Sequence, residues 1–201
     1  MIRIEANPAA VERAVEILRN DGVVAYPTET VYGLAVNPLS DTALCALFLT
    51  KGRSENNPIL LVVSSEEQML PLVRGITPAH RACMEAFWPG PLSLLFEPSD
   101  LVPASITAGS GKVCIRQTAH PVAQELCRAW GGAITSTSAN RSGQPPARTP
   151  EEVELSGVAL VLDGGPLPLS PPSTVYDPIT RRILRQGAIL ESELKSALNR
   201  S

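Results

Sequence analysis

Apolar residues recur every three or four positions over the first periodic segment of the chain, which predicts a helix with one buried face. The positions concerned are Val11, Ala14, Val15 and Leu18. Asn7 can cap this helix, Pro8 suits its first turn, and Gly22 ends it. The unbroken apolar run Val23–Tyr26 that follows is typical of a buried strand.

The rest of the chain alternates helical segments with strand-length apolar runs. Further helices are expected after Ser40, after Ser64 with Glu67 at capping-box spacing, from Thr77 toward Trp88, over Pro121–Trp130, after Thr149 and from about Glu191. Further strands are expected at residues 59–63, 92–96, 112–116, 133–135, 160–162, 174–177 and 182–185. Because the alternation has no strict repeat, the predicted class is α/β, with a mixed, twisted sheet flanked by helices. The proline-containing loops at residues 141–148 and 164–172 are the expected mobile segments.

The composition fits one globular unit. A chain of 201 residues can bury about 70% of its unfolded surface, and we expect a single domain over residues 1–201. The net charge of −3 gives no overall field that attracts nucleic acid, so any RNA contact would need a local basic patch. No apolar run approaches the ~18 residues of a membrane span, and the amino terminus lacks a signal-peptide pattern. These features predict a cytoplasmic protein with no membrane partner.

The four cysteines form neither a metal-binding pattern nor a disulfide pattern. They are Cys45, Cys83, Cys114 and Cys127, which lie far apart and include no C-x-x-C pair. This spacing favours buried, reduced thiols, and we expect no metal held by protein ligands.

Familiar catalytic signatures are incomplete. The Gly-Ser-Gly-Lys run that ends at Lys112 resembles part of a P-loop, but Val113 replaces the magnesium-binding hydroxyl and Ile106 stands where the first glycine belongs. No glycine-rich dinucleotide fingerprint follows the first strand. Neither His80 nor His120 lies beside a nucleophile elbow, so a serine–histidine triad is unsupported. What remains is catalysis by positioning and charge stabilisation.

Two polar clusters about eighty residues apart carry the groups that an anionic ligand needs. The first contains Lys51, Arg53 and Asn57, and the second contains Ser136, Ser138 and Asn140. Phosphoryl or nucleotidyl transfer requires cations aimed at developing negative charge, and Arg116 and Arg185 are further candidates near strand ends. Taken singly, each of these residues could equally be a solvated charge, a helix cap or a turn residue, so the residue types leave both interpretations open.

Seven motifs extend this picture along the chain. They are the run from Tyr26 to Leu34; Lys51-Gly52-Arg53 with Asn57-Pro58; Phe87-Trp88-Pro89-Gly90-Pro91-Leu92; Val113-Cys114-Ile115-Arg116 before His120-Pro121; the run from Ser136 to Gly143; Ser173-Thr174-Val175; and Ile183-Leu184-Arg185-Gln186-Gly187. In content and order they resemble the YrdC-like family of threonylcarbamoyl-AMP synthases. The resemblance covers most of the chain, from about Val23 to Gly187.

This resemblance implies a fold and a reaction. The implied fold is a twisted, mixed α/β sheet curved around a large open cavity. The implied enzyme is a nucleotidyltransferase that forms threonylcarbamoyl-AMP and pyrophosphate from L-threonine, bicarbonate or CO2, and ATP, with Mg²⁺ accompanying ATP. Its product serves threonylcarbamoyladenosine formation at position 37 of tRNAs that read ANN codons. Because the chain ends about fourteen residues after Gly187, it resembles the short bacterial form, which relies on separate proteins for the transfer step.

The resemblance also implies residue roles. Threonine or its carbamate would contact Thr30, Arg116, Ser136 and Ser173. ATP would contact Arg53, Asn57, Ser138, Asn140 and Arg185. Lys51 and Arg53 would be catalytic, offsetting charge as the carbamate attacks the α-phosphate. Val62 stands where some family members carry a histidine, so one substrate contact is expected to be missing or replaced.

Two alternatives stay open. A non-catalytic tRNA- or rRNA-binding protein could use the same concave surface, although the acidic pI and the scarcity of aromatic residues predict weak tRNA binding at most. A paralogous enzyme could act on another carbamoyl donor or nucleotide. Dependence of ATP turnover on threonine distinguishes the synthase from both.

Overall fold

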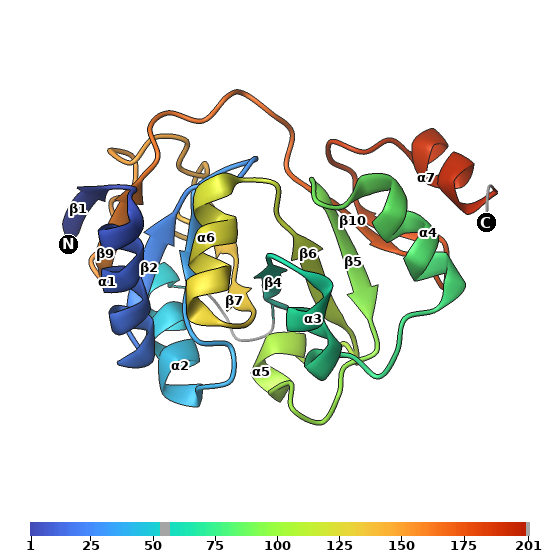
Figure 1. Cartoon of the computed structure of the whole chain (residues 1–201), viewed down its shortest axis with the longest axis horizontal. Helices are drawn as coiled ribbons and strands as arrows, with labels where there is room; N and C mark the ends of the chain where they lie inside the picture. Colours follow the sequence, from blue (N-terminus) through green and yellow to red (C-terminus); the bar gives the residue numbers. More distant parts are fainter. Residues whose placement is uncertain (53–56, 200–201) are drawn as a thin grey trace.

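The computed structural model places the strands of the chain in two sheets, with helices packed against them (Figure 1). The structure describes residues 1–52 and 57–199. The helices are α1 (Pro8–Arg19), α2 (Asp41–Lys51), α3 (Glu66–Met69), a 3-10 turn (Leu70–Leu72), α4 (Pro78–Phe87), α5 (Ala104–Thr107), α6 (Pro121–Trp130) and α7 (Glu191–Leu198). The strands are β1 (Ile2–Glu5), β2 (Val23–Tyr26), β3 (Gly33–Ala35), β4 (Leu60–Val63), β5 (Leu92–Phe96), β6 (Val113–Gln117), β7 (Ile134–Thr135), β8 (Thr137–Ser138), β9 (Val158–Asp163), β10 (Thr174–Asp177) and β11 (Arg182–Arg185).

Both sheets are mixed. The five-stranded sheet has the order β1-β9-β2-β3-β8, with β9 parallel to β1 and β2, and with antiparallel pairing from β2 onward. The six-stranded sheet has the order β11-β10-β5-β6-β4-β7, in which the β10–β5 and β6–β4 pairs are parallel and the rest antiparallel. The predicted α/β class with mixed sheet pairing is therefore confirmed, with the strands divided between two sheets.

Helices α1 and α6 form one layer that covers strands of both sheets. The Asn7 side chain caps α1 by accepting a 3.0 Å hydrogen bond from the Ala10 amide, as the sequence pattern predicts. The cluster buried beneath the two helices includes Val24 and Leu160 from the five-stranded sheet together with Val62 from the six-stranded one. This shared apolar layer joins the two sheets.

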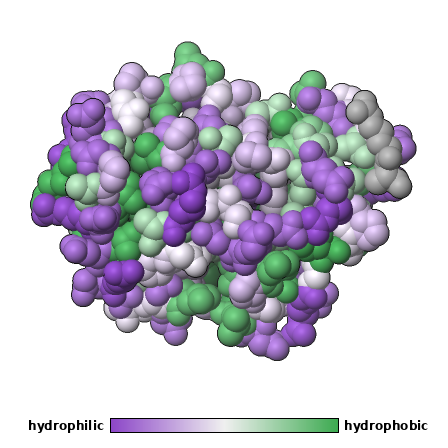
Figure 2. Space-filling view, viewed as in Figure 1, coloured by the Kyte–Doolittle hydropathy of each residue, from purple (hydrophilic) through white to green (hydrophobic). Residues whose placement is uncertain are grey.

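A second and larger apolar cluster contains residues that alternate along the strands with those of the first, so it lies on the other face of these strands. Helices α4 and α7 pack against each other at the far end of the six-stranded sheet (Figure 1). The surface shown in Figure 2 is mostly hydrophilic, with separate apolar groups between the polar side chains. Within residues 1–52 and 57–199, no helix has the length and apolar character required to cross a membrane.

The four cysteines are unpaired; three are buried as predicted, whereas Cys45 is exposed.

Two predicted helix starts are wrong. No helix follows Thr149, because the Glu152 carboxylate accepts hydrogen bonds from the Arg148 and Thr149 amides and closes a local turn, and β9 begins soon afterwards at Val158. Helix α3 begins at Glu66 rather than after a cap at Ser64, and Ser64 bonds instead to the Gln68 side chain. Local hydrogen bonds of short polar side chains compete with regular helix caps in both places.

The sequence pattern also missed several short elements. They are β1, β3, β8 and α5, none longer than four residues. Elements this short show too few turns of a helix or alternations of a strand for the periodicity of their residues to be recognised.

Candidate functional site

A cavity of about 690 Å³ opens between one face of the six-stranded sheet and a set of loops. Its size falls within the range usual for small-molecule sites. The sheet side is lined by Leu60, Leu95, Cys114, Arg116, Val175, Asp177, Arg182, Leu184 and Arg185. The loop side is lined by loop residues that include Thr28, Thr30, Val31, Ser136, Asn140, Gln144 and Pro146, together with Gly33, Thr137 and Ser138 of the short strands β3 and β8.

Strand alternation places Arg116 in this cavity. Successive side chains of a strand point to opposite faces, so Cys114 and Arg116 share one face of β6. Both line the cavity, whereas Val113 and Ile115 lie in the large apolar cluster on the other face. Because β6 lies between β4 and β5, the Arg116 side chain is only 2% exposed.

The same alternation along the start of β10 brings Ser173, Val175 and Asp177 to the cavity wall. Arg185 reaches Ser173 from β11 and donates from Nε and Nη2 to its carbonyl oxygen at 3.1 and 2.9 Å, and from Nη2 to its hydroxyl at 2.9 Å. The buried Ser93 hydroxyl lies 2.9 Å from that of Ser173. Burial and the nearby charge of Arg116 lower the pKa of Arg185, which nevertheless stays protonated because a guanidinium does not lose its proton in proteins.

The loop opposite is shaped by Thr28. Its hydroxyl donates to the carbonyl oxygen of Val31 at 2.7 Å and lies 3.1 Å from the Thr30 hydroxyl. Gly33 then passes close to Ser136, since a Cβ atom on Gly33 would stand 3.2 Å from the Ser136 hydroxyl. This close approach brings the two predicted segments against each other.

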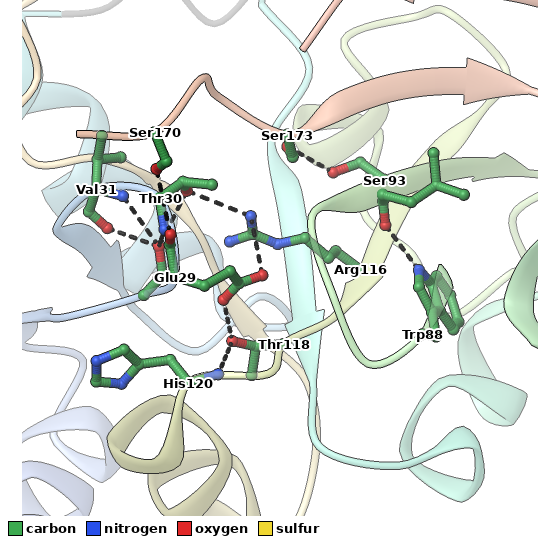
Figure 3. Close-up of polar contacts among 12 residues, drawn as sticks. Glu29, Thr30, Val31, Trp88, Ser93, Arg116, Thr118, His120, Ser170 and Ser173 are labelled. Atoms are coloured by element: carbon green, nitrogen blue, oxygen red, sulfur yellow. Dashed lines mark hydrogen bonds and ion pairs between the residues drawn. The ribbon is translucent and has the colours of Figure 1, made fainter. Parts of the chain in front are cut away.

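Arg116 and Thr30 meet across the cavity floor (Figure 3). Arg116 Nη1 lies 3.4 Å from the Thr30 hydroxyl and 3.4 Å from Glu29 Oε1. The other Glu29 oxygen accepts a 2.7 Å hydrogen bond from Thr118, whose hydroxyl also accepts the His120 amide. Burial lowers the pKa of His120, while the charge of Glu29 acts in the opposite direction.

Lys51 links the two polar clusters of the sequence. It ends α2, its side chain is buried, and its Nζ donates to the carbonyl oxygens of Ser138 and, at 2.9 Å, Asn140. A cation at the carboxyl end of a helix is also favoured by the helix dipole. The ammonium group therefore holds the Ser136–Asn140 segment against the end of α2.

Most of the predicted site residues come together in this cavity. Those that line it are Thr30, Arg116, Ser136, Ser138, Asn140, Ser173 and Arg185. Lys51 lies behind the wall, through its bonds to Ser138 and Asn140, and Asn57 is exposed and outside the described lining. Arg53 lies outside the described residues. The roles implied for all of these residues stay predictions.

Of the wall formed by β10 and β11, sequence reasoning singled out only Ser173 and Arg185 as site residues. Asp177, Thr180 and Arg182 also line this wall but lie outside the motifs, and Leu184 lies within a motif without having been named as a site residue. The available signal was weak: Asp177 is two and four positions from Val175 and Ser173, so alternation alone would have placed it on the same face. Ser93 and Thr118 were missed as well, because they act through contacts with distant residues.

The segment 164–173, here called the strap, crosses from β9 to β10 over the top of the molecule in Figure 1. Arg148 fixes it: Nη1 donates to the Pro168 carbonyl at 2.9 Å and to the Thr30 carbonyl at 3.4 Å, and Nη2 donates to the Ser170 carbonyl at 2.8 Å. Tyr32 adds a 2.8 Å bond to the Gly165 carbonyl, and burial raises the pKa of that tyrosine to about 12. The proline-rich strap is thus anchored to the loop that carries Thr30.

Replacing Arg148 with alanine should release the strap. The substitution removes three hydrogen bonds from one guanidinium, and a hydrogen bond to a charged group contributes about 1.5–3 kcal/mol. The strap should therefore open more often, and chymotrypsin should cleave the Leu169–Ser170 bond at least about tenfold faster than in wild type. Leu169 is 91% exposed and therefore available to the protease. Arg3→Ala is the matched control, because Arg3 bonds Glu151 and the Pro150 carbonyl rather than the strap. Equal cleavage rates for wild type and Arg148→Ala would show that the strap does not depend on Arg148.

The described residues include no group of three or more His, Cys, Asp or Glu side chains that could hold a metal ion. Asp177 is the acidic residue in the described cavity lining, and its Oδ1 accepts the Ile179 amide at 2.9 Å and the Thr180 amide at 3.4 Å. The basic residues of that lining are Lys112, Arg116, Arg182 and Arg185. The cavity therefore favours anionic ligands over isolated cations.

Comparison with known proteins agrees with these features. The Sua5/YciO/YrdC family model, described as "Telomere recombination", matches residues 16–187. The threonylcarbamoyl-AMP synthase of Klebsiella pneumoniae is 36% identical over 182 residues, covering 89% of this chain and 96% of the relative. That of Alkalilimnicola ehrlichii is 41% identical over 174 residues, covering 84% and 90% respectively. These relatives indicate that the chain is an enzyme.

Solved structures support the same grouping. The crystal structure of Pyrococcus abyssi Sua5 complexed with L-threonine has a TM-score of 0.90 and 33% sequence identity, and covers 98% of this chain. The match spans 59% of the Sua5 chain. Escherichia coli YciO has a TM-score of 0.82 over 96% of this chain at 24% identity, which shows a common fold. The family model matches residues 16–187, and the two curated relatives are 36% and 41% identical over 89% and 84% of the chain. The chain therefore belongs to the Sua5/YciO/YrdC family.

Proposed function

We propose that the chain is a threonylcarbamoyl-AMP synthase, a nucleotidyltransferase that converts L-threonine, bicarbonate or CO2, and ATP into threonylcarbamoyl-AMP and pyrophosphate. The observation that carries the proposal is the convergence of Arg116, Ser136 and Ser173, from three separate segments, on one cavity of about 690 Å³. The names of the curated relatives, at 36–41% identity, support the same activity. The similar Sua5 structure supports it as well, because that protein was solved in complex with L-threonine.

Arg116 is the proposed partner of the threonine carboxylate. A guanidinium presents a fork of donors that matches a carboxylate, and its burial reduces competition from water. The hydroxyls of Thr30 and Ser136 lie on the loop side of the cavity, and that of Ser173 lies on the sheet side. Placed between them, the amino acid would present its amine to bicarbonate or CO2 for carbamate formation.

The nucleotide would occupy the rest of the cavity. In the proposed step, a carbamate oxygen attacks the α-phosphorus of ATP, the bond from that phosphorus to the bridging oxygen breaks, and pyrophosphate leaves with the electron pair. Arg185 and Arg182 line the cavity and would offset negative charge on the phosphates, together with Arg53. Lys51 would contribute by fixing the Ser138 and Asn140 backbone and by its charge at the end of α2.

Mg²⁺ would arrive as the counter-ion of the triphosphate. Magnesium in nucleotide sites is held largely by phosphate oxygens and water, with only one or two carboxylates. This fits a described lining in which Asp177 is the acidic residue and already accepts two backbone amides. MgATP is accordingly treated as the substrate.

The proposal extends to the product. A mixed anhydride with AMP is a reactive species, so separate transfer proteins would consume it in the cytoplasm to modify adenosine 37 of tRNAs that read ANN codons. Any direct contact with tRNA would be weak, given the net charge of −3.

The direct test is pyrophosphate release by the purified protein with MgATP, with and without L-threonine and bicarbonate. We expect release that requires threonine and falls when bicarbonate and CO2 are removed. Release that is indifferent to threonine would favour a paralogous activity. No release from folded protein, combined with steeply salt-dependent RNA binding, would favour the RNA-binding alternative.

A further inference from the structure

Glu29 is a carboxylate that lies behind the cavity wall, next to the buried guanidinium of Arg116. Its side chain is 17% exposed, and it is not among the described residues that line the cavity. Figure 3 shows the carboxylate between Arg116 on one side and Thr118 on the other. No step of the proposed reaction uses Glu29, so its position beside the proposed carboxylate-binding arginine requires an explanation of its own.

The Glu29 carboxylate makes a long contact with Arg116 and a short hydrogen bond with Thr118. Arg116 Nη1 and Glu29 Oε1 are 3.4 Å apart, whereas charge-assisted hydrogen bonds are usually about 2.7–2.9 Å long. The Thr118 hydroxyl, in contrast, donates to Glu29 Oε2 at 2.7 Å. Thr118 therefore holds the carboxylate in place.

Two atoms of this pair lack hydrogen-bond partners. Among the described residues, Glu29 Oε1 and Arg116 Nε are buried with no hydrogen bond. Buried charged groups are normally hydrogen-bonded as well as paired, because an unsatisfied one is costly. Glu29 thus places a negative charge beside Arg116 without using up the hydrogen-bonding capacity of the guanidinium.

This fixed charge limits what can bind to Arg116. Any carboxylate that pairs with Arg116 must lie near Glu29, in a buried setting where charges are screened far less than in water. A plain carboxylate is repelled there. An α-amino acid carries its ammonium group on the same carbon atom as its carboxylate, so its own positive charge offsets the repulsion.

We propose that Glu29 is a specificity-determining residue, whose charge makes the Arg116 site select a zwitterionic α-amino acid over a carboxylate that lacks the ammonium group. The inference rests on the proposed function in one respect, namely that an amino acid binds at Arg116. Selection acts through space, because Glu29 Oε1 is buried behind the wall and no contact with the ligand is required.

Calorimetric binding of two matched ligands tests this inference. The ligands are L-threonine and (R)-3-hydroxybutyrate, which is the same molecule without its amino group. Wild type should bind threonine at least about thirtyfold more tightly, and Glu29→Gln should reduce this ratio about tenfold, mainly by strengthening 3-hydroxybutyrate binding. Thr118→Val keeps the charge and should keep the ratio within about threefold of wild type.

Glu151→Gln is the matched control, because it removes the charge of an exposed carboxylate paired with Arg3, away from the cavity lining, and should leave the ratio unchanged. An unchanged ratio in folded Glu29→Gln would overturn the inference. If that variant does not fold, wild type decides, because equal binding of the two ligands by wild type would also overturn the inference. Absence of threonine binding to wild type would instead contradict the proposed function itself.

Discussion

Arg116→Lys should raise the KM for L-threonine roughly 30–150-fold in the pyrophosphate-release assay. Lysine keeps the positive charge next to Glu29 but presents a single ammonium in place of the planar fork, so bidentate pairing with the substrate carboxylate is lost. A charged hydrogen bond of this kind contributes about 2–3 kcal/mol, and each 1.4 kcal/mol corresponds to a factor of ten in affinity. Lysine is preferable to alanine here, because alanine would leave the Glu29 carboxylate, which is 17% exposed, without the opposite charge of Arg116.

The control for this variant is Arg128→Lys. Arg128 is exposed on α6, where it pairs with Glu125, and it is not among the described residues lining the cavity. We expect its KM and its melting temperature to match those of wild type. A threonine KM for Arg116→Lys within threefold of the wild-type value would remove Arg116 from the amino-acid site.

Gly187→Ala should lower the melting temperature by about 6–12 °C. A Cβ atom at this position would stand 2.1 Å from the Pro172 carbonyl oxygen and 2.6 Å from both the carbonyl carbon of Ser173 and the amide nitrogen of Thr174. These are backbone atoms, so the chain must move apart, and overpacking of this kind costs about 3 kcal/mol. In a chain of this size, 1 kcal/mol shifts the midpoint by about 2–4 °C.

The same substitution should weaken substrate binding, because Ser173 belongs to the cavity wall and its backbone would be displaced. Gly132→Ala is the matched control: its Cβ would meet only the Trp130 ring, at 3.8 Å, which is an ordinary contact. Thermal melting by circular dichroism, with the threonine KM measured on the same preparations, checks both effects. A midpoint for Gly187→Ala within 2 °C of wild type would show that the 172–174 backbone adapts without cost.

Long periodic elements could be predicted from the sequence because the residues that define such an element lie within one continuous stretch. Helix α1 has its Asn7 cap, its proline and its apolar face within one stretch, and α6 follows the predicted Pro121–Trp130 bounds. The turn after Thr149 could not be predicted, because the Glu152 carboxylate that closes it competes with a helix cap. The division of the strands between two sheets was equally hidden, since pairing partners such as β1 and β9 are more than 150 residues apart.

The candidate site also contains some residues that the sequence could predict and others that it could not. Arg116 stands out as a charge within apolar strand sequence, Ser136 belongs to a run of hydroxyl residues, and both line the cavity. Arg148 and Ser93 act on residues that are distant in sequence, so no local pattern marks them as parts of the site, and the motif that contains Glu29 does not indicate its contact with Arg116. Residues that line the cavity could be proposed from motifs, whereas residues that position them could be identified only from contacts in the structure.

The bonds from Lys51 to the Ser138 and Asn140 carbonyls make the two polar clusters energetically interdependent. A substitution in either cluster will disturb the other, and the free-energy changes of paired substitutions will not add, as is usual for residues in one hydrogen-bond network. Under the proposed residue roles, single alanine variants will therefore combine losses of nucleotide affinity with losses of amino-acid affinity. Only double-mutant cycles across the shared ammonium group will separate the two.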